Sequence, residues 1–210
     1  MSDRPTLSVL MNRHGTDKLW LHHYDGEYTR HFEPLRDRPI RLLEIGIGGY
    51  GTHGRGGHSL HVWRDYGPTW QVFGLDIEDK SFLDGDRLTT IKGDQSDTHG
   101  LAAIDRAHGP FDVVIDDGSH RQIDILTSFN ALFPLLASGG IYVIEDLETA
   151  YRPDHGGHPE PLAAGGSVSL IADLIDGLHH QFWHGRVPSP IQRSVKSVHV
   201  SKELVFIYKA

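Results

Sequence analysis

Short apolar runs that end in glycine or aspartate alternate along this chain with longer amphipathic stretches. The runs have apolar residues on both faces, which is typical of strands inside a parallel sheet. Strand, helix and parallel strand form a right-handed βαβ unit, so the alternation predicts a doubly wound α/β fold with helices on both faces. The predicted strands are 41–47, 71–77, 88–91, 111–117 and 140–146, and the predicted helices are 59–66, 101–107, 122–136 and 167–180.

The C-terminal end of the chain breaks this alternation. Two β-rich runs, 195–200 and 204–208, are joined only by Ser201, Lys202 and Glu203. A parallel crossover needs about a dozen residues, so this short link predicts an antiparallel hairpin. A Rossmann-like, mostly parallel sheet that ends in such a hairpin strand is typical of class I methyltransferases, and this is the fold class that we predict.

The residues before the first strand carry an aromatic pattern. Tyr24, Tyr28 and Phe32 recur at every fourth position, which predicts an amphipathic helix or a lid. A chain of 210 residues suits one compact domain. We therefore expect a single domain over 1–210, with an N-terminal helical lid over 1–38 and an α/β core over 39–210.

Charge and residue usage narrow the class of partner. The chain has 20 Lys and Arg against 28 Asp and Glu, a formal net charge of −8. This balance disfavours general binding to nucleic acid or to anionic membranes, because both need a basic surface. No apolar run approaches the roughly 18 residues of a membrane span, no signal sequence is visible and cysteine is absent. We expect a cytoplasmic protein that acts on a small molecule.

A glycine-rich turn follows the first predicted strand. Gly46, Gly48 and Gly51 match the G-x-G-x-x-G pattern of dinucleotide-binding folds. In those folds a helix begins at the third glycine, so that its N-terminus faces a pyrophosphate. Here a polar, glycine-rich loop over 52–57 delays the predicted helix to about Ser59. The match is therefore a weak signal, and a nicotinamide or flavin cofactor stays an alternative.

Acidic residues at the strand ends favour S-adenosylmethionine (SAM). Glu44 lies two residues before Gly46, where a carboxylate would repel a diphosphate but suits the cationic amino-acid end of SAM. Asp76 ends the second strand, where an acidic residue accepts hydrogen bonds from ribose hydroxyls. Asp94 follows the third strand, where such folds hold adenine. The alternative to any cofactor is that the glycines serve only as turn residues. The predicted cofactor-binding residues of this region are Glu44, Gly46, Gly48, Gly49, Asp76 and Asp94.

A second acidic group follows the fourth and fifth predicted strands. Asp117 and His120 close the fourth strand, and Glu145 and Asp146 close the fifth. Ends of neighbouring parallel strands meet where open α/β sheets bind ligands, so the three carboxylates are expected to converge. Carboxylates so close repel one another unless a cation joins them, and oxygen ligands favour Mg²⁺, with Mn²⁺ or Ca²⁺ as alternatives. The alternative without function is that these acids cap helices or face solvent.

These residues predict a reaction. An aliphatic alcohol is a poor nucleophile because its proton leaves only at very high pH. A divalent cation lowers the pKa of a bound hydroxyl, and His120, three residues beyond Asp117, can accept the proton near neutral pH. The oxygen then attacks the sulfonium methyl group in line. The residues thus predict a metal-dependent O-methyltransferase with His120 as its general base.

Taken together, the motifs resemble a known family, the magnesium-dependent macrocin- and mycinamicin-type sugar O-methyltransferases of antibiotic biosynthesis. The resemblance runs from residue 14 to about 157 in family order, and the combination of motifs is specific. It implies a SAM- and Mg²⁺-dependent enzyme that methylates a sugar hydroxyl of a glycosylated natural product. The matching segments are 14–18, 42–50, 74–77, 93–97, 116–120 and 144–147.

The resemblance also implies roles for individual residues. Asp117, Glu145 and Asp146 would bind Mg²⁺, and His120 would be the general base. Members of the family assemble, so the resemblance implies a homo-oligomer. The residues implied for the cofactor are Thr16, Gln95 and Asp116, and those implied for the lid or the acceptor are Lys18, Tyr24, Tyr28 and Tyr151.

Departures from the family pattern fall where the acceptor should lie. Residues 148–151 read Glu-Thr-Ala-Tyr, where the family tends to have glutamine and a Tyr-Trp pair. Two alternatives to a sugar O-methyltransferase stay open. One is a metal-dependent catechol-type O-methyltransferase, and the other is a non-catalytic SAM-binding accessory protein. The acidic charge disfavours a nucleic-acid substrate, and the Asn/Asp-Pro-Pro-Tyr/Phe motif of amino-methylating enzymes is absent.

Overall fold

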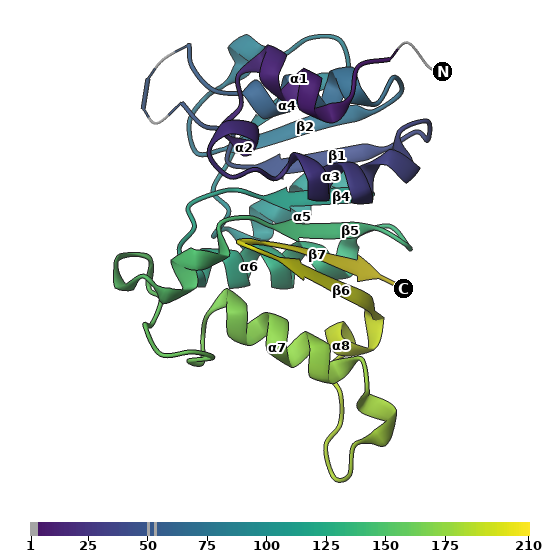
Figure 1. The fold of residues 1–210 in the computed structure, drawn as a ribbon, viewed down its shortest axis with the longest axis vertical. Coiled ribbons are helices and arrows are strands. Elements are labelled where there is room, and N and C mark those ends of the chain that lie inside the picture. The colour runs from purple at the N-terminus through teal and green to yellow at the C-terminus, as the bar shows by residue number, and fades with distance from the viewer. Residues whose placement is uncertain (1–3, 50, 53) are drawn as a thin grey trace. The chain divides into compact units, whose positions relative to one another are not determined.

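The computed structural model describes residues 4–49, 51–52 and 54–210. The chain forms two compact units, Met1–Gly93 and Asp94–Ala210. Figure 1 follows the chain through both units, from the N-terminal helices to the C-terminal hairpin. The expected single domain with a lid over 1–38 stays a prediction. No helix in the described ranges is long and apolar enough to cross a membrane.

The first unit contains a parallel three-stranded ladder in the order β3-β2-β1. Leu43 pairs with Phe73, which in turn pairs with Thr89. The centres of β1 and β2 are buried on both faces, as the apolar runs predicted. Helix α4 packs against β2 and β3 and begins one residue before the predicted position. The bounds are β1 Arg41–Ile45, β2 Gln71–Asp76, β3 Leu88–Lys92, α4 His58–Tyr66 and η2 Ser81–Leu83.

Short helices precede the first strand, and the aromatic pattern lies on one of them. Tyr28 and Phe32 of α3 are fully buried. Their ring centroids lie 4.9 and 5.4 Å from that of Trp63 in α4, so the expected amphipathic helix is present and packs on the core. Tyr24 directly precedes α3 and is also buried. The bounds are α1 Leu7–His14, α2 Asp17–Trp20, α3 Asp25–Phe32 and η1 Glu33–Leu35.

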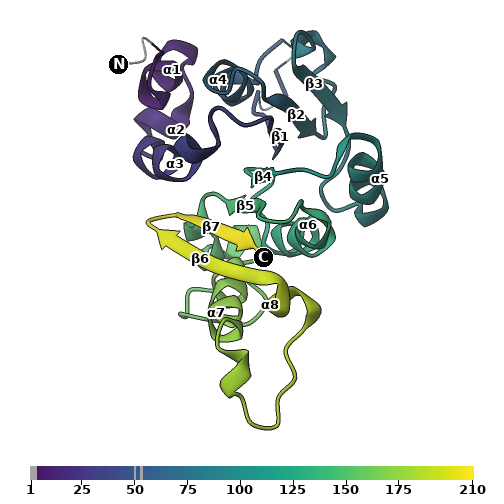
Figure 2. The same ribbon diagram turned by 90° about the vertical axis from the view of Figure 1, so that its right-hand side faces the viewer.

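The second unit contains four strands in the order β4-β5-β7-β6. Strands β4 and β5 are parallel, with Val114 opposite Tyr142. Strand β7 runs antiparallel to both β5 and β6, which confirms the predicted hairpin; Figure 2 shows it in yellow. The bounds are β4 Val113–Asp116, β5 Ile141–Ile144, β6 Val195–Ser201 and β7 Leu204–Lys209.

The helices of the second unit begin and end where local chemistry dictates. Helix α5 is capped by Asp97, whose Oδ1 accepts from the backbone N–H of His99 at 3.1 Å. Helix α6 stops before the predicted residue 136 because Pro134 has no N–H to continue the ladder. The bounds are α5 Thr98–His108, α6 Gln122–Leu132, η3 Phe133–Leu135, η4 Leu147–Tyr151, η5 Pro153–His155, α7 Ser167–Gly177, η6 His180–Phe182 and α8 Pro190–Ser194.

Candidate functional site

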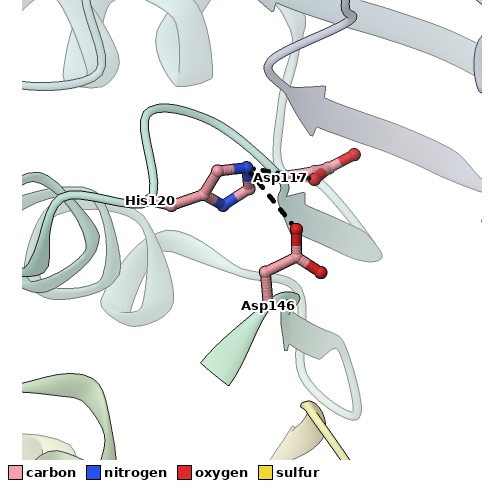
Figure 3. A group of neighbouring side chains, drawn as sticks. All are labelled: Asp117, His120 and Asp146. Carbon is pink, nitrogen blue, oxygen red and sulfur yellow. Dashed lines mark ion pairs between the residues drawn. The ribbon is translucent and has the colours of Figure 1, made fainter. Parts of the chain in front are cut away.

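Three predicted site residues meet at the ends of β4 and β5. Asp117 directly follows β4, and Asp146 follows β5 by two residues. The Nε2 atom of His120 lies 3.8 Å from Oδ1 of Asp117 and 3.6 Å from Oδ2 of Asp146 (Figure 3). Among the described residues, these three form a group whose donor atoms all lie within 4.8 Å of one another. The predicted convergence of strand ends is therefore present for these three side chains.

The donor set of this cluster fits a hard divalent cation. It offers two carboxylates and one imidazole, and the three side chains are partly buried. Carboxylates held so close are favourable only when a cation or a protonated imidazole offsets their repulsion. Glu145 is buried and is not one of the three described residues of the group. Its role as a metal ligand stays a prediction.

Two of the three cluster residues have a left-handed backbone. The φ angles are 56° at His120 and 54° at Asp146. Such a conformation is uncommon for residues other than glycine and costs about 1–3 kcal/mol, so it persists only where the surrounding structure holds it. Strain of this kind is concentrated at functional sites, and here it sits on the residues that carry the cluster.

The loop that bears Asp117 and His120 is held by Gln95. The Oε1 atom of Gln95 accepts from the backbone N–H of Ser119 at 2.7 Å. Its Nε2 donates to Oδ1 of Asp116 at 3.2 Å. A Cβ on Gly118 would lie 2.0 Å from Gln95 Oε1, so only glycine allows this approach. Gln95 thus restrains the loop, and its predicted contact with a cofactor stays a prediction.

Asp116, the last residue of β4, is buried and fully engaged with neighbouring side chains. Its carboxylate accepts from Gln95, from the hydroxyl of Ser128 and from the hydroxyl of Tyr142. Burial nevertheless raises the pKa of Asp116 to about 6, because the hydrogen bonds only partly offset the loss of solvation. The structure therefore gives Asp116 a packing role inside the second unit, and its contact with the cofactor stays a prediction.

The glycine turn of the first unit has backbone angles and close contacts that require glycine. Gly49 has a φ of 99° and Gly56 a φ of 108°. A Cβ on Gly56 would lie 2.6 Å from the carbonyl oxygens of Ile47 and Gly48. Any side chain would therefore push the two halves of the loop apart. Tyr50 of the predicted motif lies outside the described residues.

Asp76 lies at the end of β2 and holds the start of this loop. Its Oδ2 accepts from the backbone N–H of Ile47 at 3.1 Å, and its Oδ1 accepts from that of Glu78 at 2.9 Å. Each carboxylate oxygen keeps further lone-pair capacity for a ligand hydroxyl. The placement agrees with the predicted ribose contact, which stays a prediction.

Lys80 is a loop-holding residue that the sequence patterns missed. Its side chain is buried, and its Nζ donates to the carbonyl oxygen of Arg55 at 3.3 Å and to Oε2 of Glu78 at 2.9 Å. A Cβ on Gly49 would lie 2.6 Å from this Nζ. Lys80 belongs to no recognisable sequence motif. Its place in the loop that follows Asp76 is the feature of the sequence that could have indicated a role near the glycine turn.

Glu44 and Lys18, which the sequence assigned to different roles, form a buried ion pair. The Nζ of Lys18 lies 3.2 Å from Oε1 of Glu44, and both side chains are almost fully buried. Trp63 Nε1 donates to Oε2 of Glu44 at 2.8 Å. Thr16 caps α2, its hydroxyl accepting from the backbone N–H of Lys18 at 3.4 Å. Their predicted roles at the cofactor and in the lid stay predictions.

Two further predicted residues are at the surface. Asp94 accepts from the backbone N–H and the hydroxyl of Ser96 at 2.8 and 2.7 Å, and these bonds lower the pKa of Asp94. Tyr151, at the end of η4, is 41% exposed. It lines a small pocket of the second unit together with Leu162 and Val168.

Curated relatives match almost the whole chain, although no family profile does. The chain is 45% identical over 213 residues to the mycinamicin VI 2''-O-methyltransferase of Micromonospora griseorubida. This alignment covers 99% of this chain and 53% of that protein. It is 43% identical over 211 residues to the 8-demethyl-8-alpha-L-rhamnosyl tetracenomycin-C 2'-O-methyltransferase of Streptomyces olivaceus, with 99% and 55% covered. The chain thus spans about half the length of the curated relatives it matches.

A solved structure agrees with these relatives. The MycE methyltransferase of the mycinamycin biosynthetic pathway, in complex with Mg, SAH and mycinamycin VI, superposes with a TM-score of 0.96 at 44% identity. The match covers 100% of this chain and 54% of that one, and it confirms the predicted class I methyltransferase fold. By sequence and by fold, the chain is therefore similar to macrocin- and mycinamicin-type sugar O-methyltransferases over about half of their length.

Proposed function

We propose that this chain carries the methyl-transfer centre of a SAM- and Mg²⁺-dependent O-methyltransferase that acts on a sugar hydroxyl of a glycosylated natural product. The observation that carries the proposal is the cluster of Asp117, His120 and Asp146. It occurs in a chain that is 44% identical to a methyltransferase solved with Mg, SAH and a mycinamycin.

The residues of the cluster divide the chemistry between them. Asp117 and Asp146, with the neighbouring Glu145 as a third candidate, would hold the cation. When bound, a divalent cation lowers the pKa of the acceptor hydroxyl and fixes its position. His120 Nε2 lies 3.8 and 3.6 Å from the two carboxylates and would accept the proton of that hydroxyl. The methyl group then moves in line from sulfur to oxygen, and the SAM sulfonium leaves as a neutral thioether.

The test of this proposal is an acceptor panel with and without metal. Mycinamicin VI and demethylmacrocin represent glycosides, and a catechol represents the competing phenol class. We expect methylation of a glycoside with Mg²⁺, loss of turnover in EDTA and recovery when Mg²⁺ is restored, followed by mass spectrometry of the product. Full activity in chelator would exclude the metal mechanism, transfer to catechol alone would favour a catechol-type enzyme, and SAH binding without any transfer would favour an accessory protein.

The proposed ribose contact predicts an effect on cofactor affinity. Removing the Asp76 carboxylate by Asp76→Ala deletes a charged acceptor and the bond that holds Ile47 N–H. Because hydrogen bonds to charged groups contribute about 1.5–3 kcal/mol, SAH should bind about 10- to 100-fold more weakly by isothermal titration calorimetry. Asp86→Ala, which removes the same charge from a side chain that is 90% exposed, is the matched control. Equal affinities of the two variants would contradict the assignment, and preferential binding of NAD to the unmodified protein would replace SAM as the cofactor.

A further inference from the structure

One buried glutamine is linked to the backbone of both strained residues of the cluster. Gln122 is the first residue of α6, and its side chain is buried. Its Nε2 donates to the carbonyl oxygen of His120 at 3.3 Å and to Oγ1 of Thr149 at 3.2 Å. Thr149 Oγ1 in turn donates to the carbonyl oxygen of Asp146 at 2.8 Å. One amide and one hydroxyl therefore join the carbonyls of His120 and Asp146.

The hydrogen-bonding capacity of this amide matches its surroundings. A glutamine amide has two N–H donors, and each of them reaches one of the two acceptors above. Its Oε1 accepts from the backbone N–H of Ser167, the first residue of α7, at 2.7 Å. The backbone donor at Ser167 dictates which end of the amide is oxygen. A carboxylate would face the His120 carbonyl with a second oxygen, and an apolar side chain would leave buried polar groups unpaired.

This amide is placed where the backbone needs restraint. His120 and Asp146 both have left-handed φ angles, which persist only when surrounding contacts hold them. The φ angle of each residue sets the direction in which its side chain leaves the backbone. If either peptide relaxed, the 3.6 Å approach between His120 Nε2 and Asp146 Oδ2 would not be retained.

We propose that Gln122 is a positioning residue of the metal site, acting directly on the backbone of His120 and, through Thr149, on that of Asp146. Its contacts hold Asp146 where it would bind the ion and His120 beside it as the proposed base, and its own amide is occupied by His120, Thr149 and Ser167. The inference rests on the proposed function, since it requires that the cluster binds a divalent cation. Nothing in the sequence patterns marked Gln122, which lies two residues after His120.

The test measures Mn²⁺ binding to the whole chain, by electron paramagnetic resonance of the free ion. Gln122→Met keeps the length of the side chain and removes its hydrogen bonds, and we expect the affinity for Mn²⁺ to fall about 10- to 100-fold. Gln192→Met is the matched control in the same unit. Gln192 is also buried, and its amide bonds to Asp173 and to the backbone N–H of Ser189 instead of to the cluster. This control should lose thermal stability while its Mn²⁺ affinity stays unchanged.

A second pair of variants gives a decision if Gln122→Met fails to fold. Thr149→Val removes the hydroxyl that bonds to Asp146, and Thr149→Ser retains it. We expect weaker Mn²⁺ binding in the valine variant and near-normal binding in the serine variant. Equal affinities in this pair, an unchanged affinity in Gln122→Met, or an equal loss in Gln192→Met would overturn the positioning role. Absence of Mn²⁺ binding in the unmodified chain would instead overturn the metal site itself, which separates failure of this inference from failure of the proposed function.

Discussion

His120→Ala is expected to lower kcat for methyl transfer by about 10²- to 10⁴-fold, because the imidazole is the proposed acceptor of the hydroxyl proton. Its Nε2 lies 3.8 and 3.6 Å from the carboxylates of Asp117 and Asp146, which are the proposed ligands of the ion that positions the hydroxyl. The measurement is single-turnover kinetics at saturating SAM and Mg²⁺. A general base contributes to the chemical step, so KM for the acceptor should change much less than kcat.

Two controls separate loss of the base from loss of the backbone conformation. His120→Asn removes the imidazole but tolerates the left-handed φ of 56° better than alanine does. We expect both variants to be similarly slow and to retain Mn²⁺ binding within a few-fold. His99→Ala, which removes an exposed histidine of α5, should leave kcat unchanged. If His120→Ala turns over at the normal rate, the role of general base is lost; if Mn²⁺ binding disappears with the imidazole, His120 is a ligand of the metal.

Glu44→Gln is expected to lower the free energy of unfolding by about 3–5 kcal/mol, because it removes the carboxylate charge that lies 3.2 Å from the buried ammonium of Lys18. The glutamine oxygen can still accept from Trp63 Nε1, so the change isolates the charge. Urea denaturation followed by tryptophan fluorescence measures the effect, since Trp63 lies beside the pair.

The double variant tests whether the loss comes from the buried charge of Lys18. Adding Lys18→Met to Glu44→Gln removes the buried ammonium as well, so we expect recovery of more than half of the lost free energy. Asp37→Asn, which breaks the exposed pair with Arg4, should leave the denaturation midpoint nearly unchanged. A Glu44→Gln variant as stable as the unmodified protein would mean that water or a rotated side chain compensates Lys18.

The sequence predicted the elements of the fold well, because a strand that is buried on both faces requires a continuous apolar run. Strand β1 ends at Ile45 and β2 at Asp76, close to the predicted ends, and α4 begins at His58 where Ser59 was expected. Helix ends were predicted less well. The apolar spacing continues to residue 136, so the predicted helix extended over 122–136. Helix α6 instead ends before Pro134, which cannot continue the helical hydrogen bonds.

The sequence also predicted that Asp117, His120 and Asp146 lie close together, because the ends of β4 and β5 are paired in register. Asp116 lies opposite Ile144, which brings the residues that follow each of them close together. The register of the strands brings their ends together, but it does not determine which side chain of a consecutive pair faces the other strand end. Here Asp146, whose backbone is left-handed, joins Asp117 and His120 in the described group, while the adjacent Glu145 is buried.

The order of strands and helices, the glycine turn and the acidic strand ends were determined by the sequence alone, because each depends on residues adjacent in the chain. Tertiary structure decided which side chains meet. Lys18 pairs with Glu44, and Gln122 reaches Thr149, through contacts between elements that are far apart in sequence. Such partners depend on how helices settle on strands, and no local pattern records that packing.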